Sequence, residues 1–238
     1  MFKVLTIFYA MTLNMLAPGA GSIFFKKYQL AFFTQGLLLL IVSTICLSRV
    51  VLTPAGITAL ILTLASVHLG SWTLCIHQSL NTQIKFDWRN FFYSAVFCVF
   101  WLAVFMVGFV YKNRFFGIQI YFIPSPSMQP TLEPGDVILV DTWAYRNQAP
   151  QLGDIIIFTS DAHQGVLVKR IQPWPEGVES EEKYYVMGDN RKESLDSRYF
   201  GGIEQKQIQG KVELILLSTA PTLKFRENRW LKSPISFP

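Results

Sequence analysis

The sequence predicts a membrane protein in two parts, a helical N-terminal half followed by a soluble, mostly β domain. Uncharged runs long enough for the about 20 apolar residues that cross a hydrocarbon core occur at residues 4–25, 28–48, 50–84 and 90–111. After Tyr111 the apolar runs become short, and basic and acidic side chains are balanced at 15 each. We therefore expect a transmembrane region with three or four spans at 1–111 and one compact domain at 112–238.

Three of the runs predict regular transmembrane helices, at 28–48, about 54–76 and 91–111. The 50–84 run is longer than one span needs. We place the start of its helix at Pro54, because proline suits the first turn of a helix.

The run at about 4–25 predicts a weaker span, because it is interrupted by Asn14, Pro18, Gly19 and Gly21. It is compatible with a span, a re-entrant turn or an interfacial helix. A cleavable signal peptide at 1–20 is less favoured, since these residues disturb the apolar region and Lys3 alone supplies a positive start.

The net charge of +5 comes from residues that flank the apolar runs. If the last span runs outward from the cytoplasm, four cations flank the spans on the cytoplasmic side: Lys26, Lys27, Lys85 and Arg89. Two lie in the other flanks: Lys3 and Arg49. This distribution fits the positive-inside tendency. Lys112 and Arg114 just outside the last span weaken it, so charge alone leaves the orientation open. The balanced soluble half has no basic cluster, which argues against a nucleic-acid partner.

The cysteines give no sign of a disulfide framework or of a thiolate metal site. Cys46, Cys75 and Cys98 all lie inside the apolar runs, where buried packing is the expected role. We expect the protein to use neither a metal nor a cofactor.

Short apolar and β-branched runs predict five strands in the soluble half, at 136–140, 154–158, 166–171, 184–187 and 211–216. Glycine-containing turn sequences lie beside several of them. No helical period of useful length follows Tyr111. Residues 173–182, which contain two prolines, a glycine and four glutamates, predict a surface loop.

Ser127 is a candidate nucleophile close to the membrane, since it follows soon after the last apolar run. A serine hydroxyl needs a neighbouring base to take its proton. The three histidines make a Ser-His-Asp triad improbable, because His68 and His77 fall in or beside a span and His163 lies in a turn-like segment. Lysine is the remaining base.

Lys169 has a setting that suits this role, because Leu167 and Ile171 share its face of the predicted strand. Apolar surroundings disfavour the ammonium form and can lower the pKa of a lysine by up to about 3–5 units. Taken alone, however, Lys169 followed by Arg170 is more typical of a solvated strand edge.

Three segments together resemble the type I signal peptidases, membrane-bound serine proteases with a Ser-Lys dyad. These segments, 124–132, 165–171 and 187–198, occur in the family's order within residues 118–216. The resemblance implies that Ser127 is the nucleophile and Lys169 the general base. It also implies roles for four supporting residues: Ser125 in the oxyanion hole with the Ser127 N–H, Ser194 as a hydrogen-bond partner of the lysine amine, and Asp196 and Arg198 as an ion pair.

The implied function is removal of N-terminal signal peptides from exported preproteins, with cleavage after small residues at an Ala-x-Ala-like site. The implied partners are preproteins and the lipid bilayer, with the catalytic domain on the periplasmic or extracytoplasmic face of the cytoplasmic (inner) membrane. An extended substrate could pair with the aromatic segment 115–123. Candidate pocket walls, each of which could equally be core, are Ile123, Met128, Leu132, Leu167 and Val168.

Three features depart from the family's usual pattern: Pro126 between the two serines, only 18 residues between Lys169 and Gly188, and the larger number of N-terminal spans. Two alternatives therefore stay open. One is a specialised relative that matures a pilin or a conjugation or secretion substrate. The other is a non-enzymatic membrane protein, which the intact Ser127 and Lys169 and the uncharged spans disfavour.

Overall fold

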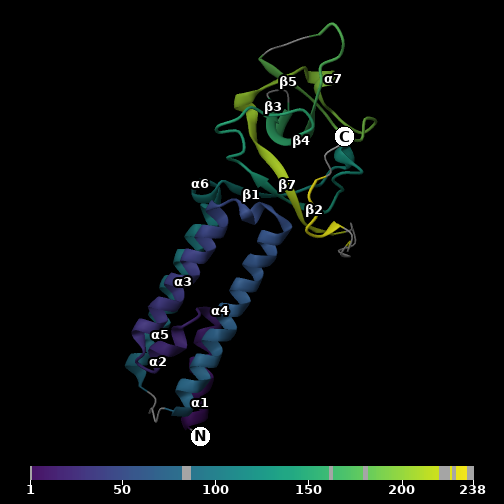
Figure 1. Cartoon of the computed structure of the whole chain (residues 1–238). Coiled ribbons are helices and arrows are strands. Elements are labelled where there is room, and N and C mark those ends of the chain that lie inside the picture. The colour runs from purple at the N-terminus through teal and green to yellow at the C-terminus, as the bar shows by residue number, and fades with distance from the viewer. Residues whose placement is uncertain are drawn as a thin grey trace. The chain divides into compact units, whose positions relative to one another are not determined.

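The chain folds into two compact units (Figure 1). The computed structural model describes residues 2–81, 87–160, 163–178, 182–219, 226 and 229–234. The helical unit comprises Met1–Val51 and Ala55–Tyr111, and the β unit comprises Leu52–Pro54 and Lys112–Pro238. Long apolar helices followed by an antiparallel sheet confirm the predicted fold class. Lys85 and part of the loop expected at 173–182 lie outside the described residues.

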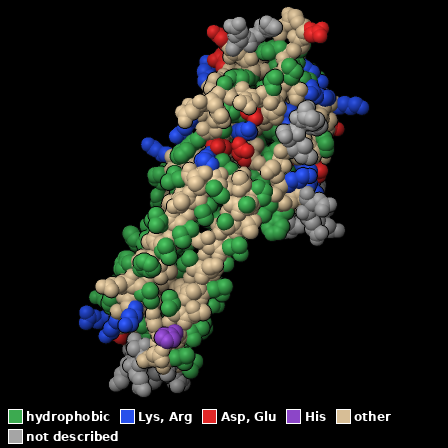
Figure 2. All heavy atoms as spheres, viewed as in Figure 1, with side chains coloured by type: hydrophobic (Ala, Val, Ile, Leu, Met, Phe, Trp, Pro, Cys, Tyr) green, Lys and Arg blue, Asp and Glu red, His purple; other side chains and the backbone are tan. Residues whose placement is uncertain are grey.

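Among the described residues of the helical unit, three helices are long and apolar enough to cross a membrane: α3 (Tyr28–Leu47), α4 (Pro54–Asn81) and α5 (Trp88–Val110). Figure 2 shows hydrophobic side chains along their outer surface. α4 begins at Pro54, after a short 3-10 turn at Val50–Leu52. It continues past the expected end near residue 76, because neither a charge nor a proline or glycine interrupts the chain before Asn81.

The first apolar run forms a helical hairpin instead of one continuous span. α1 (Phe2–Leu16) and α2 (Ala20–Phe24) are separated by a turn in which Gly19 has a φ of 93°. Tyr9 contacts Phe91 and the Cys98 thiol donates to the Leu13 carbonyl, so α1 runs parallel to α5. α2 then returns toward the start of α3, which is the geometry of a re-entrant turn.

A buried polar network holds this turn. The side-chain amide oxygen (Oδ1) of Asn14 accepts hydrogen bonds from the Gly19 N–H at 2.7 Å, from the Gly21 N–H at 3.4 Å and from the Ser71 hydroxyl at 2.9 Å. Gln35 of α3 donates to the Pro18 carbonyl at 3.0 Å. Polar backbone inside an apolar bundle needs such internal partners, so the residues that weaken the first run as a span are the ones that build its turn.

We predict that Asn14→Leu loosens the helical unit, because it removes the acceptor of two turn N–H groups and of Ser71. Stability in detergent should fall by about 1–3 kcal/mol, the usual cost of leaving buried polar groups unpaired. Thr12→Val is the matched control, since Thr12 is exposed and its hydroxyl donates only within α1, to the Phe8 carbonyl. Equal thermal stability of the two variants would contradict the role of Asn14.

The β unit contains a seven-stranded antiparallel sheet with the order β1-β2-β7-β3-β4-β5-β6. Its strands are β1 (Ile118–Phe122), β2 (Asp136–Asp141), β3 (Ile155–Ser160), β4 (His163–Gln172), β5 (Lys183–Met187), β6 (Ile203–Glu204) and β7 (Ile208–Ser218). Five of them lie where the sequence predicts strands, and β1 and β6 are additional. Two short helices, α6 (Lys112–Phe116) and α7 (Ser197–Phe200), complete the unit, with 3-10 turns at Pro126–Met128 and Gln205–Gln207.

Both faces of the sheet are covered, which explains why β3 is apolar without alternation. Ile155 and Ile157 belong to one buried cluster, and Ile156 and Phe158 belong to the other. The link between β1 and β2 contributes three residues to the first cluster: Ile123, Met128 and Leu132. These buried anchors fix the segment that carries Ser127.

Candidate active site

Ser127 lies in a tight turn whose shape is set by its neighbours. Pro126 occupies the first position of the 3-10 turn Pro126–Met128, a place where a missing N–H costs nothing. The Ser125 hydroxyl accepts a hydrogen bond from the Ser127 N–H at 3.3 Å. Pro126, which departs from the family pattern, therefore stiffens the turn and leaves the Ser127 N–H in place.

Lys169 reaches Ser127 from β4. Its amine nitrogen lies 2.9 Å from the Ser127 hydroxyl oxygen, a hydrogen bond between residues 42 positions apart in the chain. Both residues are buried, with relative exposures of 3% for Lys169 and 8% for Ser127. The structure thus brings together the two residues expected to form the dyad, within hydrogen-bonding reach.

Burial lowers the pKa of the Lys169 amine from its ordinary value, and the carboxylates of Asp196 and Asp189 act in the opposite direction. Desolvation is the larger effect, because it penalises the ammonium form while the amine gains no direct ion pair among the described residues. The site therefore favours a neutral amine more than water does.

The expected ion pair between Asp196 and Arg198 is present, with Arg198 Nε donating to one carboxylate oxygen at 2.8 Å and Nη2 to the other at 3.0 Å. Asp196 is fully buried and also accepts the Gly188 N–H at 3.0 Å. Its burial alone would raise the pKa of the carboxyl, but the bonds from Arg198 and Gly188 outweigh burial and lower it. Asp196 thus stays ionised and ties α7 to the end of β5.

Ser194 is buried beside the dyad, but it makes no hydrogen bond to Lys169 in the described part of the chain. Its oxygen would lie only 2.2 Å from a Cβ placed on Gly188, and the same Cβ would lie 2.5 Å from the Ser127 carbonyl oxygen. Gly188 therefore lets the segment after β5 approach both serines. The direct contact between Ser194 and the lysine amine remains a prediction.

Arg170 is a site residue to which the sequence analysis assigned no role. It is 1% exposed, so the solvated-edge interpretation of the Lys169-Arg170 pair is wrong. Its guanidinium donates to both carboxylate oxygens of Asp189, at 2.9 and 2.7 Å, to the Gly153 carbonyl at 2.9 Å and to the Thr131 hydroxyl at 3.3 Å. Arg170 thus joins three loops around the dyad, and its only sequence signal was its place directly after Lys169 in the predicted strand.

Asn190 holds the nucleophile turn directly. Its backbone N–H donates to the Ser127 carbonyl at 3.0 Å, and its side-chain amide donates to the Pro126 carbonyl at 3.3 Å. Sequence reasoning identified residues 188–190 only as a turn within a supporting segment. The structure shows that this turn holds the carbonyl groups on both sides of the Ser127 Cα.

The five candidate pocket residues differ in exposure. Ile123, Met128 and Leu132 are at most 4% exposed and belong to the core. Leu167 and Val168 are half-buried, and they pack against opposite faces of the sheet. The side chain of His163 lies outside the described residues. Within the described part of the chain, no group of three or more His, Cys, Asp or Glu side chains is arranged to hold a metal ion.

Comparison with known protein families defines the class of this protein. A family model described as signal peptidase, peptidase S26, matches residues 96–176 and 172–217, together just over half of the 238 residues. The chain is therefore a serine peptidase of the hydrolase class. It belongs to the signal peptidase family, peptidase S26. The two matched segments overlap at 172–176, at the end of β4, within the short stretch between Lys169 and Gly188.

Curated relatives agree with this assignment. The chain is 31% identical over 137 residues to a probable signal peptidase I-1 of Synechocystis sp., covering 41% of this chain and 70% of the relative. It is 26% identical over 138 residues to signal peptidase I V of Bacillus subtilis, covering 39% and 82%. Signal peptidase I of Mycobacterium tuberculosis is 41% identical over 76 residues, covering 30% and only 26%.

We predict that Gly188→Ala lowers peptidase activity at least tenfold and destabilises the β unit by about 1–3 kcal/mol, the usual cost of overpacking. The new methyl group would overlap the Ser194 side chain and the Ser127 carbonyl, and backbone cannot move aside as a flexible side chain can. Gly70→Ala is the control, because a Cβ there would meet nothing within 4 Å. Full activity of Gly188→Ala in a peptide cleavage assay would show that the close approach of Gly188 to Ser194 and to the Ser127 carbonyl is not required.

Proposed function

We propose that the protein removes N-terminal signal peptides from exported preproteins with Ser127 as nucleophile and Lys169 as general base. The observation that carries the proposal is the 2.9 Å contact between the Lys169 amine and the Ser127 hydroxyl in a buried setting. Membership of the signal peptidase family supplies the reaction class. A Ser-Lys pair can replace the serine-histidine arrangement in this chemistry.

In the first half of the reaction, the neutral Lys169 amine takes the proton of Ser127 as the hydroxyl oxygen attacks the scissile carbonyl. A carbon–oxygen bond forms and a tetrahedral oxyanion results. The Lys169 ammonium then gives its proton to the leaving nitrogen as the carbon–nitrogen bond breaks. The mature protein leaves with a new amino terminus, and the signal peptide stays esterified to Ser127.

In the second half, Lys169 accepts a proton from water while the water oxygen attacks the ester carbonyl. Collapse of the second oxyanion returns the proton to Ser127 and releases the signal peptide as a carboxylic acid. Each step needs an amine that can both accept and release a proton, and burial favours its neutral form by lowering the pKa of Lys169. Arg170, Asp189 and Asn190 act as positioning residues that hold the nucleophile turn against β4.

The Ser127 N–H and the Ser125 hydroxyl are the proposed oxyanion donors. In the structure the N–H donates to Ser125, but at 3.3 Å this bond is long and can be exchanged for a stronger one to a negative oxygen. The Ser125 hydroxyl is exposed and keeps its own proton to donate. A single donor of this kind contributes about 2.7–4 kcal/mol to the stabilisation of the transition state.

Substrate would bind as an extended strand beside the site. β1 lies at an edge of the sheet and leads directly into the Ser127 turn, which suits β-augmentation. Of the two half-buried wall candidates, Leu167 shares the face of β4 that carries Lys169 and can contact a substrate side chain at the site, whereas Val168 lies on the opposite face. Shallow apolar walls of this kind would select small residues before the scissile bond.

The proposed orientation places the β unit outside the cytoplasm. The α1–α2 hairpin brings the start of α1 to the end of the helical unit that carries Tyr28 and Trp88. Lys3 is therefore counted with Lys26, Lys27 and Arg89 among the cations on the cytoplasmic side. Counted over the same flanks, five cations, with Lys85 taken from the sequence, then oppose Arg49, compared with four against two if the first run were a span; Lys112 and Arg114 follow the last span in either case. This stronger bias supports a cytoplasmic hairpin end.

We expect Ser127→Ala to abolish processing, with a loss of about 10³-fold or more, because dyad members act as a unit. The test is incubation of detergent-purified protein with a secretory preprotein, with the new amino terminus identified by mass spectrometry. Thr159→Ala, an exposed hydroxyl on β3, should process normally. Cleavage by Ser127→Ala at more than a tenth of the unaltered rate would remove Ser127 as the nucleophile.

Lys169→Arg should be inactive although charge and bulk are largely kept, because a guanidinium stays protonated at any usable pH. Lys211→Arg is the matched control, since Lys211 forms an ion pair with Asp154 at 2.8 Å that arginine can keep. An active Lys169→Arg enzyme would mean that the lysine is not the base.

The pH dependence follows from the same amine. Protonated Lys169 cannot accept the serine proton, so kcat/KM of the unaltered enzyme should be low in acid. It should rise with pH through the pKa of Lys169, which burial moves below the ordinary lysine value. A profile that begins to rise only at the pKa of an exposed lysine would contradict a desolvated base.

The orientation can be tested with introduced cysteines, because the native Cys46, Cys75 and Cys98 are buried. A membrane-impermeant maleimide should label Leu152→Cys in intact spheroplasts, since Leu152 is exposed on the β unit. It should label Lys27→Cys only after lysis. The reverse pattern would overturn the proposed topology.

A further inference from the structure

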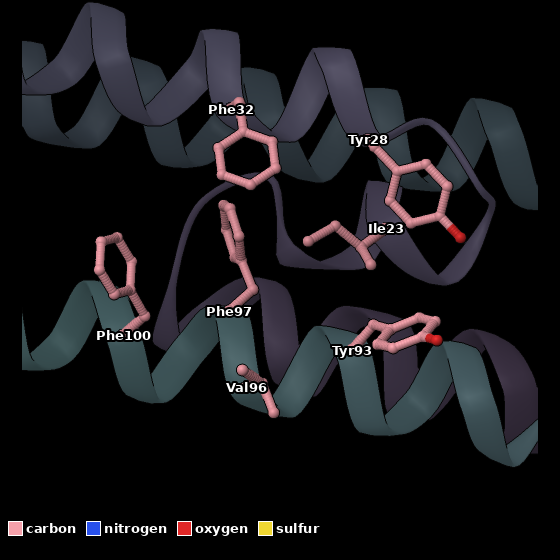
Figure 3. A pocket seen from close by; sticks show the side chains of 7 residues that line it. All are labelled: Ile23, Tyr28, Phe32, Tyr93, Val96, Phe97 and Phe100. Atoms are coloured by element: carbon pink, nitrogen blue, oxygen red, sulfur yellow. The ribbon is translucent and has the colours of Figure 1, made fainter.

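The helical unit contains an apolar groove between α2, α3 and α5, shown in Figure 3, with a volume of about 410 Å³. Its walls include Ile23 of α2, Tyr28 and Phe32 of α3, and Tyr93, Val96 and Phe100 of α5. The two tyrosine hydroxyls are the only polar side-chain groups among the lining residues. The groove therefore suits a hydrocarbon ligand and offers almost nothing to a water-soluble one.

One end of the groove is polar. Figure 3 shows the hydroxyls of Tyr28 and Tyr93 directed toward the same end, away from Phe32 and Phe100. The Tyr28 hydroxyl donates to the Asn90 side chain at 3.4 Å, and the Arg89 guanidinium donates to the Tyr93 hydroxyl oxygen. Tyrosines with an apolar ring and a polar tip mark the boundary between hydrocarbon and headgroup in a bilayer.

Three cations lie at this polar end. Lys26 and Lys27 occupy the turn that leads into Tyr28, and Arg89 lies in the first turn of α5; all three are exposed. Figure 2 shows Lys and Arg side chains gathered at the lower end of the helices. Asp87 is the sole acid in residues 1–111, and its carboxylate caps α5 by accepting the Arg89 N–H at 3.0 Å.

We propose that this groove binds an anionic phospholipid, with an acyl chain along Phe32, Val96 and Phe100 and the phosphate near Lys26, Lys27 and Arg89. From Tyr93 to Phe100 the groove follows about 10 Å of α5, enough for part of an acyl chain. Basic clusters at the end of an apolar intramembrane surface attract anionic headgroups. The site lies in the helical unit and does not depend on the proposed dyad.

The test uses detergent-purified full-length protein and native mass spectrometry. Phosphatidylglycerol should bind at least tenfold more tightly than phosphatidylcholine with the same acyl chains, and free glycerol phosphate should not bind detectably. Val96→Trp should fill the groove and reduce phosphatidylglycerol binding at least tenfold. Val99→Trp is its control, because Val99 is 67% exposed on α5 and does not line the groove.

The headgroup contacts are tested separately. The double variant Lys26→Gln, Lys27→Gln should lose about 30-fold in phosphatidylglycerol affinity, since each surface cation contributes about 1 kcal/mol and 1.4 kcal/mol corresponds to tenfold. It should bind phosphatidylcholine as before, and Arg114→Gln should change neither affinity.

Equal affinity for the two lipids, or unchanged phosphatidylglycerol binding in both Val96→Trp and the double lysine variant, would overturn the proposal. Tight binding of free glycerol phosphate would also overturn it, because the groove would then contribute nothing. If Val96→Trp slowed preprotein processing while lipid binding stayed intact, the groove would belong to the apolar segment of a preprotein and the lipid assignment would be wrong.

Discussion

The candidate active site depends on keeping the Lys169 amine out of water while it touches Ser127. An exposed lysine would be protonated at neutral pH and could not take the serine proton. Burial on β4 lowers the pKa of the amine, and the 2.9 Å contact with Ser127 gives that amine a hydrogen-bond partner that carries no charge. A carboxylate in direct contact with the amine would stabilise the ammonium form. In the structure, Asp189 is paired with Arg170 and Asp196 with Arg198.

Those arginine–aspartate pairs hold the segment after β5 in place beside the dyad, and the Arg170–Asp189 pair joins that segment to β4. Arg170 and Asp189 are both buried and doubly hydrogen-bonded, and Asp196 is buried against Arg198 and the Gly188 N–H. Removing one partner of a buried pair typically costs about 3–5 kcal/mol, because a charge is left without compensation. Combined with the two hydrogen bonds from Asn190 to the nucleophile turn, they keep Ser127 at a fixed distance from β4.

The helical unit meets a different constraint, since an apolar surrounding offers no hydrogen bonds to an open turn. Asn14, Ser71 and Gln35 supply them from three different helices. Gly21 permits this packing, because a Cβ there would lie 2.7 Å from both the Ala10 carbonyl and the Cys75 sulfur. Polar residues that disturb the hydropathy of the first run are thus structural parts of a hairpin, and this hairpin forms one wall of the groove beside α3 and α5.

The sequence by itself determined the division into membrane helices and a β domain, because uncharged length and strand-like runs are local properties. It also determined the candidate serine and lysine, through three short segments whose order resembles one family. Only the tertiary structure decided that Arg170 is buried, that Asn190 clamps the Ser127 turn and that the first apolar run doubles back. The physical reason is that each of these depends on partners far along the chain: Thr131 and Asp189 for Arg170, the Ser127 carbonyl for Asn190, and Ser71 for the turn after Asn14. Local sequence specifies which groups need such partners, and only the packed fold specifies where those partners lie.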